Sequence, residues 1–151
     1  MFKIMGFLII TVSSAIFLNQ KTIFDYFTYK FSSETAEILK LLKIECTSRK
    51  TYNKIFENVI SNNFRFYSFD GTLVINPLYI SFVHKEEKDR AERLLDNLGT
   101  KNLKNELEYI SNETEYFIYK SEFFKKKFDS NKQANLTAGI SLGIIIFLLI
   151  V

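Results

Sequence analysis

The chain has 151 residues, a net charge of +3 and a hydrophobic fraction of 47%, which allows one modest domain with additional segments. So small an excess of positive charge argues against a nucleic-acid-binding surface, which needs basic residues clustered on one face. With 5 glycines and 1 proline, helix breakers are scarce, and this favours long helices over short strands and turns. The single cysteine, Cys46, excludes an internal disulfide and a cysteine-cluster metal site.

The last segment of the chain, residues 134–151, is apolar and carries no charge. A membrane-spanning helix needs about 20 mainly apolar residues and tolerates about 17. A buried core helix is the alternative, but a helix that is apolar all round needs apolar partners on every side. A domain of this size does not supply them, so the sequence predicts a transmembrane helix over 134–151.

The first segment is shorter and more ambiguous. Its apolar block, Ile4–Leu18, follows Lys3, and a signal peptide has the same shape. Ser13-Ser14-Ala15 would be a weak cleavage site, but the apolar residues Ile16–Leu18 follow it directly. A cleavage site inside a continuing apolar run is unconvincing, so we expect an uncleaved N-terminal transmembrane helix over 1–20.

The basic residues beside the two segments predict the orientation of the chain. On the far side there is only Lys3, whereas the central segment 21–133 contributes Lys21, Lys30, Lys120, Lys125, Lys126, Lys127 and Lys132. Because lysine and arginine concentrate on the cytoplasmic side of a membrane, we expect residues 21–133 to form a cytoplasmic domain. The run Lys125–Lys127 is first a topology signal and second a site for anionic membrane lipid.

This central domain is predicted to be all-α, a helical bundle between the two transmembrane helices. Ser32 or Ser33 can cap a helix that begins near Glu34, and Thr51 can cap a second helix over Tyr52–Ser61, which would make a helical hairpin. The stretch Asn62–Val83 is less regular. Asp70-Gly71 signals a turn, Leu73–Ile75 suits either a short strand or a broken helix, and proline favours a helix over Pro77–Val83.

Two further helices are predicted to meet at a glycine. A charged helix covers Lys85–Leu98, and Gly99 stands where a left-handed cap is expected. The next helix begins at Thr100 or Asn102, and no breaker precedes the C-terminal anchor. Its apolar side follows a heptad spacing through Leu103, Leu107, Ile110, Thr114, Phe117, Ser121, Phe124 and Phe128. This seam packs either on the domain's own helices or on a second copy of the chain, so a homo-oligomer stays open.

We find no constellation for catalysis. No glycine-rich phosphate loop is present in the sequence. His84 is the only histidine, which argues against a metal site built from histidines and against a histidine-based catalytic triad. We therefore expect no catalytic, cofactor-binding or metal-binding residues. Gly139 and Gly143 form a G-x-x-x-G pattern that allows close helix approach, either to the first transmembrane helix or to another subunit.

The order of these features resembles the stage III sporulation protein AB family, over nearly the whole chain. The best local match is Leu94–Ile110, in which Leu98-Gly99 corresponds to the family's Leu-Gly. Asn102 stands at the family's capping acid and Glu106 at its glutamine. The chain departs from the family in having no glycine at about Leu95 and in replacing the usual proline-containing turn with Arg49-Lys50-Thr51.

This resemblance implies a part of the sporulation channel complex between mother cell and forespore. Family members have a soluble domain similar to the cytoplasmic domains of the type II secretion platform protein. The implied partners are the cytoplasmic stage III sporulation protein AA ATPase and other small membrane subunits of the same complex. The residues that we expect to form helix junctions or interfaces are Gly99, Asn102, Glu106, Gly139 and Gly143.

Two other classes of function remain as alternatives. The first is a membrane sensor whose two helices bracket a ligand-binding domain outside the cytoplasm, which the lysine distribution disfavours. The second is a small membrane enzyme, which the empty inventory of catalytic groups disfavours.

Overall fold

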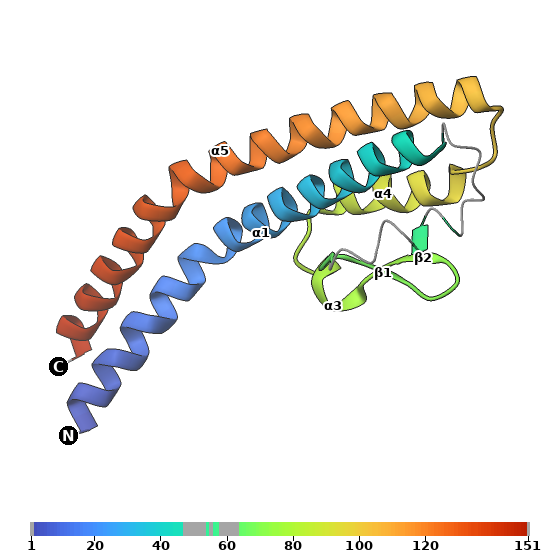
Figure 1. Cartoon of the computed structure of the whole chain (residues 1–151). Helices are drawn as coiled ribbons and strands as arrows, with labels where there is room; N and C mark the ends of the chain where they lie inside the picture. Colours follow the sequence, from blue (N-terminus) through green and yellow to red (C-terminus); the bar gives the residue numbers. More distant parts are fainter. Residues whose placement is uncertain (1, 47–53, 55, 58–63, 151) are drawn as a thin grey trace. The chain divides into compact units, whose positions relative to one another are not determined.

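The computed structural model describes residues 2–46, 54, 56–57 and 64–150 (Figure 1). In chain order its elements are α1 (Phe2–Cys46), β1 (Tyr67–Phe69), β2 (Leu73–Ile75), α3 (Pro77–Ile80), α4 (Lys85–Asn97) and α5 (Leu103–Ile150). The protein is mostly helical, as the sequence predicts, with one small β-hairpin in addition. Most of the predicted helix Tyr52–Ser61 lies outside the described residues.

The chain forms two compact units. Unit 1 contains Met1–Tyr26 and Phe124–Val151, and unit 2 contains Phe27–Phe123. The predicted transmembrane segments, 1–20 and 134–151, both fall in unit 1. Helices α1 and α5 each contribute to both units, whereas α3, α4 and the hairpin belong to unit 2 alone.

Helix α1 runs for 45 residues without interruption, so the predicted helix start near Glu34 is wrong. Ser32 and Ser33 lie inside the helix and do not cap it. A hydroxyl within a helix can satisfy its donor on the carbonyl one turn earlier, and Thr35 Oγ1 donates to Phe31 O in this way at 2.8 Å. Ser32 is fully buried. Ser32 and Thr35 therefore continue the buried side of α1 where the sequence suggests a boundary, whereas Ser33 is exposed.

The hairpin confirms the predicted turn and resolves the open choice for Leu73–Ile75, which is a strand. Strands β1 and β2 pair antiparallel, with Tyr67 opposite Ile75, and Gly71 adopts a φ of +73° in the turn. The N–H groups of Arg65 and Phe66 both donate to Glu34 Oε2, at 3.0 and 2.9 Å. Burial raises the pKa of Glu34 despite these two hydrogen bonds. This carboxylate fastens the hairpin to α1.

Helix α3 begins where proline predicts it but is shorter than the expected Pro77–Val83. Asn76 caps it by accepting a hydrogen bond from the Leu78 N–H at 3.1 Å. The helix ends at Ile80, and Val83 lies buried in the turn that leads to α4.

The core of unit 2 lies between α1, α4, α5 and the hairpin. Among the described residues, its largest fully buried apolar side chains are Phe31, Leu39, Leu42, Phe66, Leu94, Ile110 and Phe117. The Phe31 ring packs edge-on against Phe66 and Phe117, with ring centroids 5.5 and 6.4 Å apart. Ile110 and Phe117 belong to the heptad seam of α5, so this part of the seam packs within the chain. Leu103, at its start, is 54% exposed.

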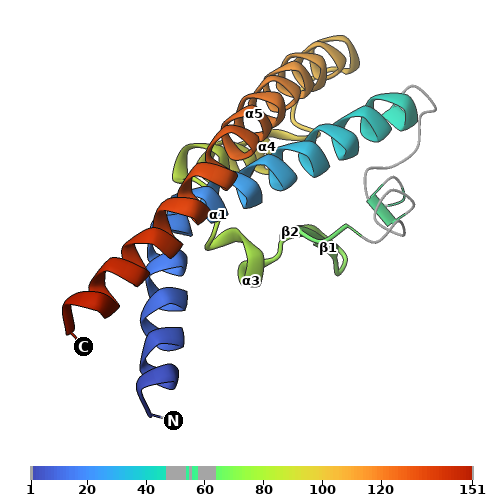
Figure 2. The ribbon, with the colours of Figure 1, turned by 90° about the vertical axis from the view of Figure 1, so that its left-hand side faces the viewer.

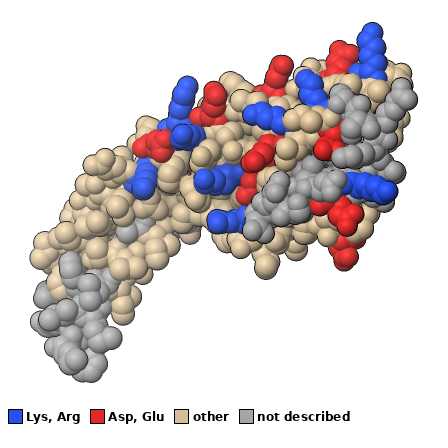
Figure 3. Space-filling view, viewed as in Figure 1, with Lys and Arg blue, Asp and Glu red and all other residues tan. Residues whose placement is uncertain are grey.

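In unit 1, the first part of α1 and the last part of α5 lie side by side and antiparallel, with both termini at the same end (Figures 1 and 2). Among the residues that the structure describes, one helix, spanning Leu103–Leu149, contains a stretch long and apolar enough to cross a membrane. In the view of Figure 3, the described side chains nearest the termini are uncharged. Both transmembrane helices stay predictions.

Candidate functional site

The structure brings Gly99, Asn102 and Glu106 together at the corner between α4 and α5. Gly99 has a φ of +80°, the left-handed conformation expected after a helix. Asn102 Oδ1 accepts a hydrogen bond from the Asn105 N–H at 3.0 Å and so caps α5. The Glu106 side chain is 2% exposed, and its Oε1 accepts from the Gly99 N–H at 2.8 Å. The corner therefore has a fixed conformation.

Replacing Gly99 with valine should destabilise this corner by about 1–2 kcal/mol, because an L-residue in the left-handed region clashes with its own backbone. Gly99→Asn is the matched control, since asparagine tolerates this conformation better than other side chains. Denaturant unfolding of the full chain in detergent measures the difference. Equal losses for the two variants would show that the positive φ is not what matters.

Ionic contacts join α4 to α5 beyond this corner. Arg90 makes a bidentate contact with Glu113 at 2.8 and 3.0 Å, and its guanidinium lies 3.5 Å from the Tyr116 ring centroid. Lys120 Nζ lies 2.9 Å from Glu87 and 3.1 Å from Glu86. Burial opposes the charge of Lys120, but these two carboxylates outweigh it and raise the pKa of Lys120. The contacts fix the face on which α4 meets α5.

Cys46 and His84 both lie in unit 2 and have structural surroundings. The Cys46 side chain is buried. The His84 backbone N–H donates to Thr28 Oγ1 at 2.9 Å, which ties the start of α4 to α1. In the part of the chain that the structure describes, no three histidine, cysteine, aspartate or glutamate residues come close enough to hold a metal ion.

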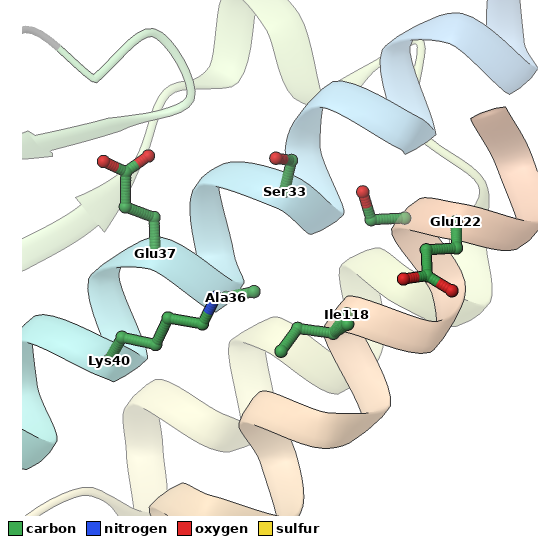
Figure 4. A pocket seen from close by; sticks show the side chains of 7 residues that line it. Ser33, Ala36, Glu37, Lys40, Ile118 and Glu122 are labelled. Atoms are coloured by element: carbon green, nitrogen blue, oxygen red, sulfur yellow. The ribbon is translucent and has the colours of Figure 1, made fainter.

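A groove opens between α1 and α5 on the surface of unit 2 (Figure 4). Its volume is about 440 Å³, and it is lined by Ser33, Ala36, Glu37, Lys40, Ile118, Ser121 and Glu122. Ser33, Ala36 and Ser121 have short side chains, so the two helices leave space between them. Glu37, Lys40 and Glu122 place both signs of charge around the groove. This surface suits a charged helix or loop of a partner better than a small apolar ligand.

The G-x-x-x-G pattern lies on the side of α5 that faces α1 within unit 1. Gly139 and Gly143 are both buried. A Cβ atom added to Gly143 would lie 2.5 Å from Thr11 Cα, which is closer than such atoms approach in proteins. Of the two partners that the sequence leaves open for this pattern, α1 of the same chain therefore occupies the position next to Gly143.

Unit 1 also contains polar contacts that sequence reasoning missed. Lys127 Nζ lies 2.8 Å from Asp25 Oδ1, and Asp25 is 0% exposed. Asn135 Nδ2 donates to Thr22 Oγ1 at 2.7 Å. Lys127 is therefore paired inside the chain, and the lipid site at Lys125–Lys127 stays a prediction. One feature of the sequence could have indicated the ion pair: Asp25 is the only acidic residue before Glu34.

Comparison of the chain with protein-family models, with curated proteins and with solved structures finds no match.

Proposed function

We propose that the chain is a non-enzymatic membrane component of a secretion-like channel complex, of the sporulation type, that docks a cytoplasmic ATPase. The observation that carries this proposal is helix α5. It continues for 48 residues, from the capped corner at Asn102 into the apolar C-terminal segment. At about 1.5 Å per residue it is about 72 Å long, more than twice the roughly 30 Å of a hydrocarbon core. A single element thus belongs to both the bundle and the membrane.

Three features favour a mechanical role, in which α5 transmits force or movement, over a catalytic role. Gly99, Asn102 and Glu106 hold the start of α5 in one conformation. No proline or glycine interrupts the sequence of α5 before Gly139, and breaks of this kind are the usual causes of sharp kinks. The groove between α1 and α5 offers a polar surface on unit 2 for a protein partner.

The proposed arrangement places two transmembrane helices in unit 1 and a cytoplasmic domain in unit 2. The lysine bias supports this arrangement, since Lys125, Lys126 and Lys132 are all exposed. In this arrangement, the resemblance to stage III sporulation protein AB implies that the bundle binds an AA-type ATPase. It implies that the transmembrane pair contacts the other small membrane subunits and lipid.

A topology reporter inserted after Asp70 in the exposed β1–β2 turn tests the orientation. We expect a green fluorescent protein inserted there to fluoresce and alkaline phosphatase inserted there to be inactive, because the turn faces the cytoplasm. Fusions after Val151 are the matched control and should give the opposite pattern, since that end crosses the membrane. An active alkaline phosphatase at Asp70 would contradict the proposed function and favour a sensor domain outside the cytoplasm.

Docking is tested separately by recovering the AA-type ATPase from the same cells with the tagged full chain. Lys40→Glu reverses a charge at the groove, and Lys54→Glu reverses an exposed charge that does not line it. We expect only Lys40→Glu to reduce recovery. Unchanged recovery with Lys40→Glu would remove the groove from the docking surface.

A further inference from the structure

A second groove runs between α1 and α5 within unit 1. Its volume is about 570 Å³. Exposed aliphatic side chains form most of its lining: Val12, Ile16, Ile23, Leu136 and Ile140. Thr11 and Asn19 complete the lining. An aliphatic surface gains free energy when hydrocarbon covers it, so the groove of unit 1 suits an apolar chain.

The length of this groove matches one leaflet of a bilayer. Along α1 its lining extends from Thr11 to Ile23, a rise of about 18 Å, and one leaflet of the hydrocarbon core is about 15 Å thick. The Ile23 end lies next to the hydrogen bond between Thr22 and Asn135, where the apolar segment of α5 begins. The other end lies beside Gly143, deep within that segment. The groove therefore follows one half of the apolar segment, from its edge to its middle.

Lysines outnumber acids on the described surface of unit 1. The exposed charged residues are Lys21, Lys125, Lys126, Lys132 and Asp129. The other acid, Asp25, is buried and lies 2.8 Å from Lys127. These residues all lie outside the apolar segments 1–20 and 134–151, at the end of unit 1 where the groove reaches Ile23. This end therefore attracts anions such as the phosphate group of a lipid.

Lys132 lies beside the end of the groove. It precedes Leu136 by four residues, so the two side chains share one face of α5. Its Nζ lies 5.6 Å from the Phe128 ring centroid, and the centroid of that ring lies 5.2 Å from that of Tyr26 in α1. The ammonium group is thus held where the two helices meet. Asp129 lies one turn farther from the groove along α5.

We propose that the groove of unit 1 binds an acyl chain of an anionic phospholipid whose phosphate group contacts Lys132. This inference rests on the proposed function, which places unit 1 in the membrane. The aliphatic lining suits the acyl chain, the length of the groove suits one leaflet, and the lysine at its end suits the phosphate group. A transmembrane helix of a second copy could cover the same lining, but it would have no anion for Lys132.

Tryptophan fluorescence tests this proposal, because the chain contains no tryptophan of its own. Ile140→Trp places the probe in the groove, and Ile16→Trp repeats the measurement from the α1 side. Leu142→Trp is the matched control: Leu142 is 40% exposed, against 42% for Ile140, and is not among the described lining residues. The full chain is reconstituted into phosphatidylcholine vesicles with a small fraction of phosphatidylglycerol, and either lipid carries bromine atoms on its acyl chains as the quencher.

We expect quenching at position 140 to show about fivefold enrichment of phosphatidylglycerol over phosphatidylcholine, the factor that about 1 kcal/mol per lysine gives. Position 142 should show no such preference. Lys132→Gln should abolish the enrichment at position 140. Lys126→Gln removes the same charge about 9 Å farther along α5 and should leave the enrichment unchanged. An enrichment that survives Lys132→Gln would overturn the contact with the phosphate group.

The remaining outcomes separate the lipid site from the proposed function. Equal quenching of positions 140 and 142 by both lipids would overturn the selective site and leave the membrane component intact. Quenching at 142 with none at 140 or 16 would show that a second copy of the chain covers the groove, and would also overturn the lipid site. Absence of quenching at 140, 16 and 142 would overturn the transmembrane pair and the lipid site together.

Discussion

Replacing Lys127 with methionine should lower the free energy of unfolding by about 3–5 kcal/mol, because it removes the cation from a buried carboxylate. Asp25 is 0% exposed, and Lys127 Nζ lies 2.8 Å from its Oδ1. Methionine keeps much of the length and apolar area of the lysine stem, so the loss reports mainly on charge. Unfolding of the full chain by denaturant in detergent micelles, followed by circular dichroism, measures it.

Two variants make this result specific. Lys126→Met changes the exposed neighbour and should alter stability by no more than about 0.5 kcal/mol. The double variant Asp25→Asn with Lys127→Met removes both charges and should recover much of the loss, since no charge is left buried without a partner. A double variant as unstable as the sum of its single changes would show that the two residues do not interact.

Replacing Gly143 with alanine should separate the two helices of unit 1. The added Cβ would meet Thr11 Cα at 2.5 Å, and a backbone atom cannot turn aside as a flexible side chain can. Overpacking of this kind costs about 1–3 kcal/mol, and over most of this range it outweighs the gain of about 1 kcal/mol that alanine normally brings to a helix. The expected result is a lower melting temperature for the full chain in detergent.

Gly6→Ala is the matched control, because it makes the same change in α1 where no atom lies within 4 Å of the added Cβ. This variant should be neutral or slightly more stable. If Gly143→Ala were also neutral, the two helices would not approach at Gly143 as closely as the structure indicates.

The sequence predicts best where local chemistry decides the structure. Gly99 and Asn102 are examples: only glycine enters the left-handed region without strain, and asparagine is among the best helix caps. The glycine that follows α4, the uninterrupted α5 and the turn at Asp70-Gly71 are predicted on the same grounds and are all present.

The remaining features depend on contacts between distant residues. Ser32 looks like a cap in sequence, yet tertiary packing buries it inside α1. Glu34 looks like a first-turn acid, yet it accepts hydrogen bonds from the N–H groups of Arg65 and Phe66. The pairing of Asp25 with Lys127 joins opposite ends of the chain, and no local pattern specifies which lysine of a run turns inward.

The distance along the chain between Asp25 and Lys127 has a consequence for the order of folding. Closing a long, unstructured loop costs conformational entropy, and this cost precedes any stabilisation by the contact that closes the loop. The bundle removes most of that cost, because Phe31 and Phe117 already hold α1 beside α5. Each helix then needs only to extend a few turns to bring the two charged groups together. A slow step in the formation of the bundle would therefore delay the pairing of Asp25 with Lys127.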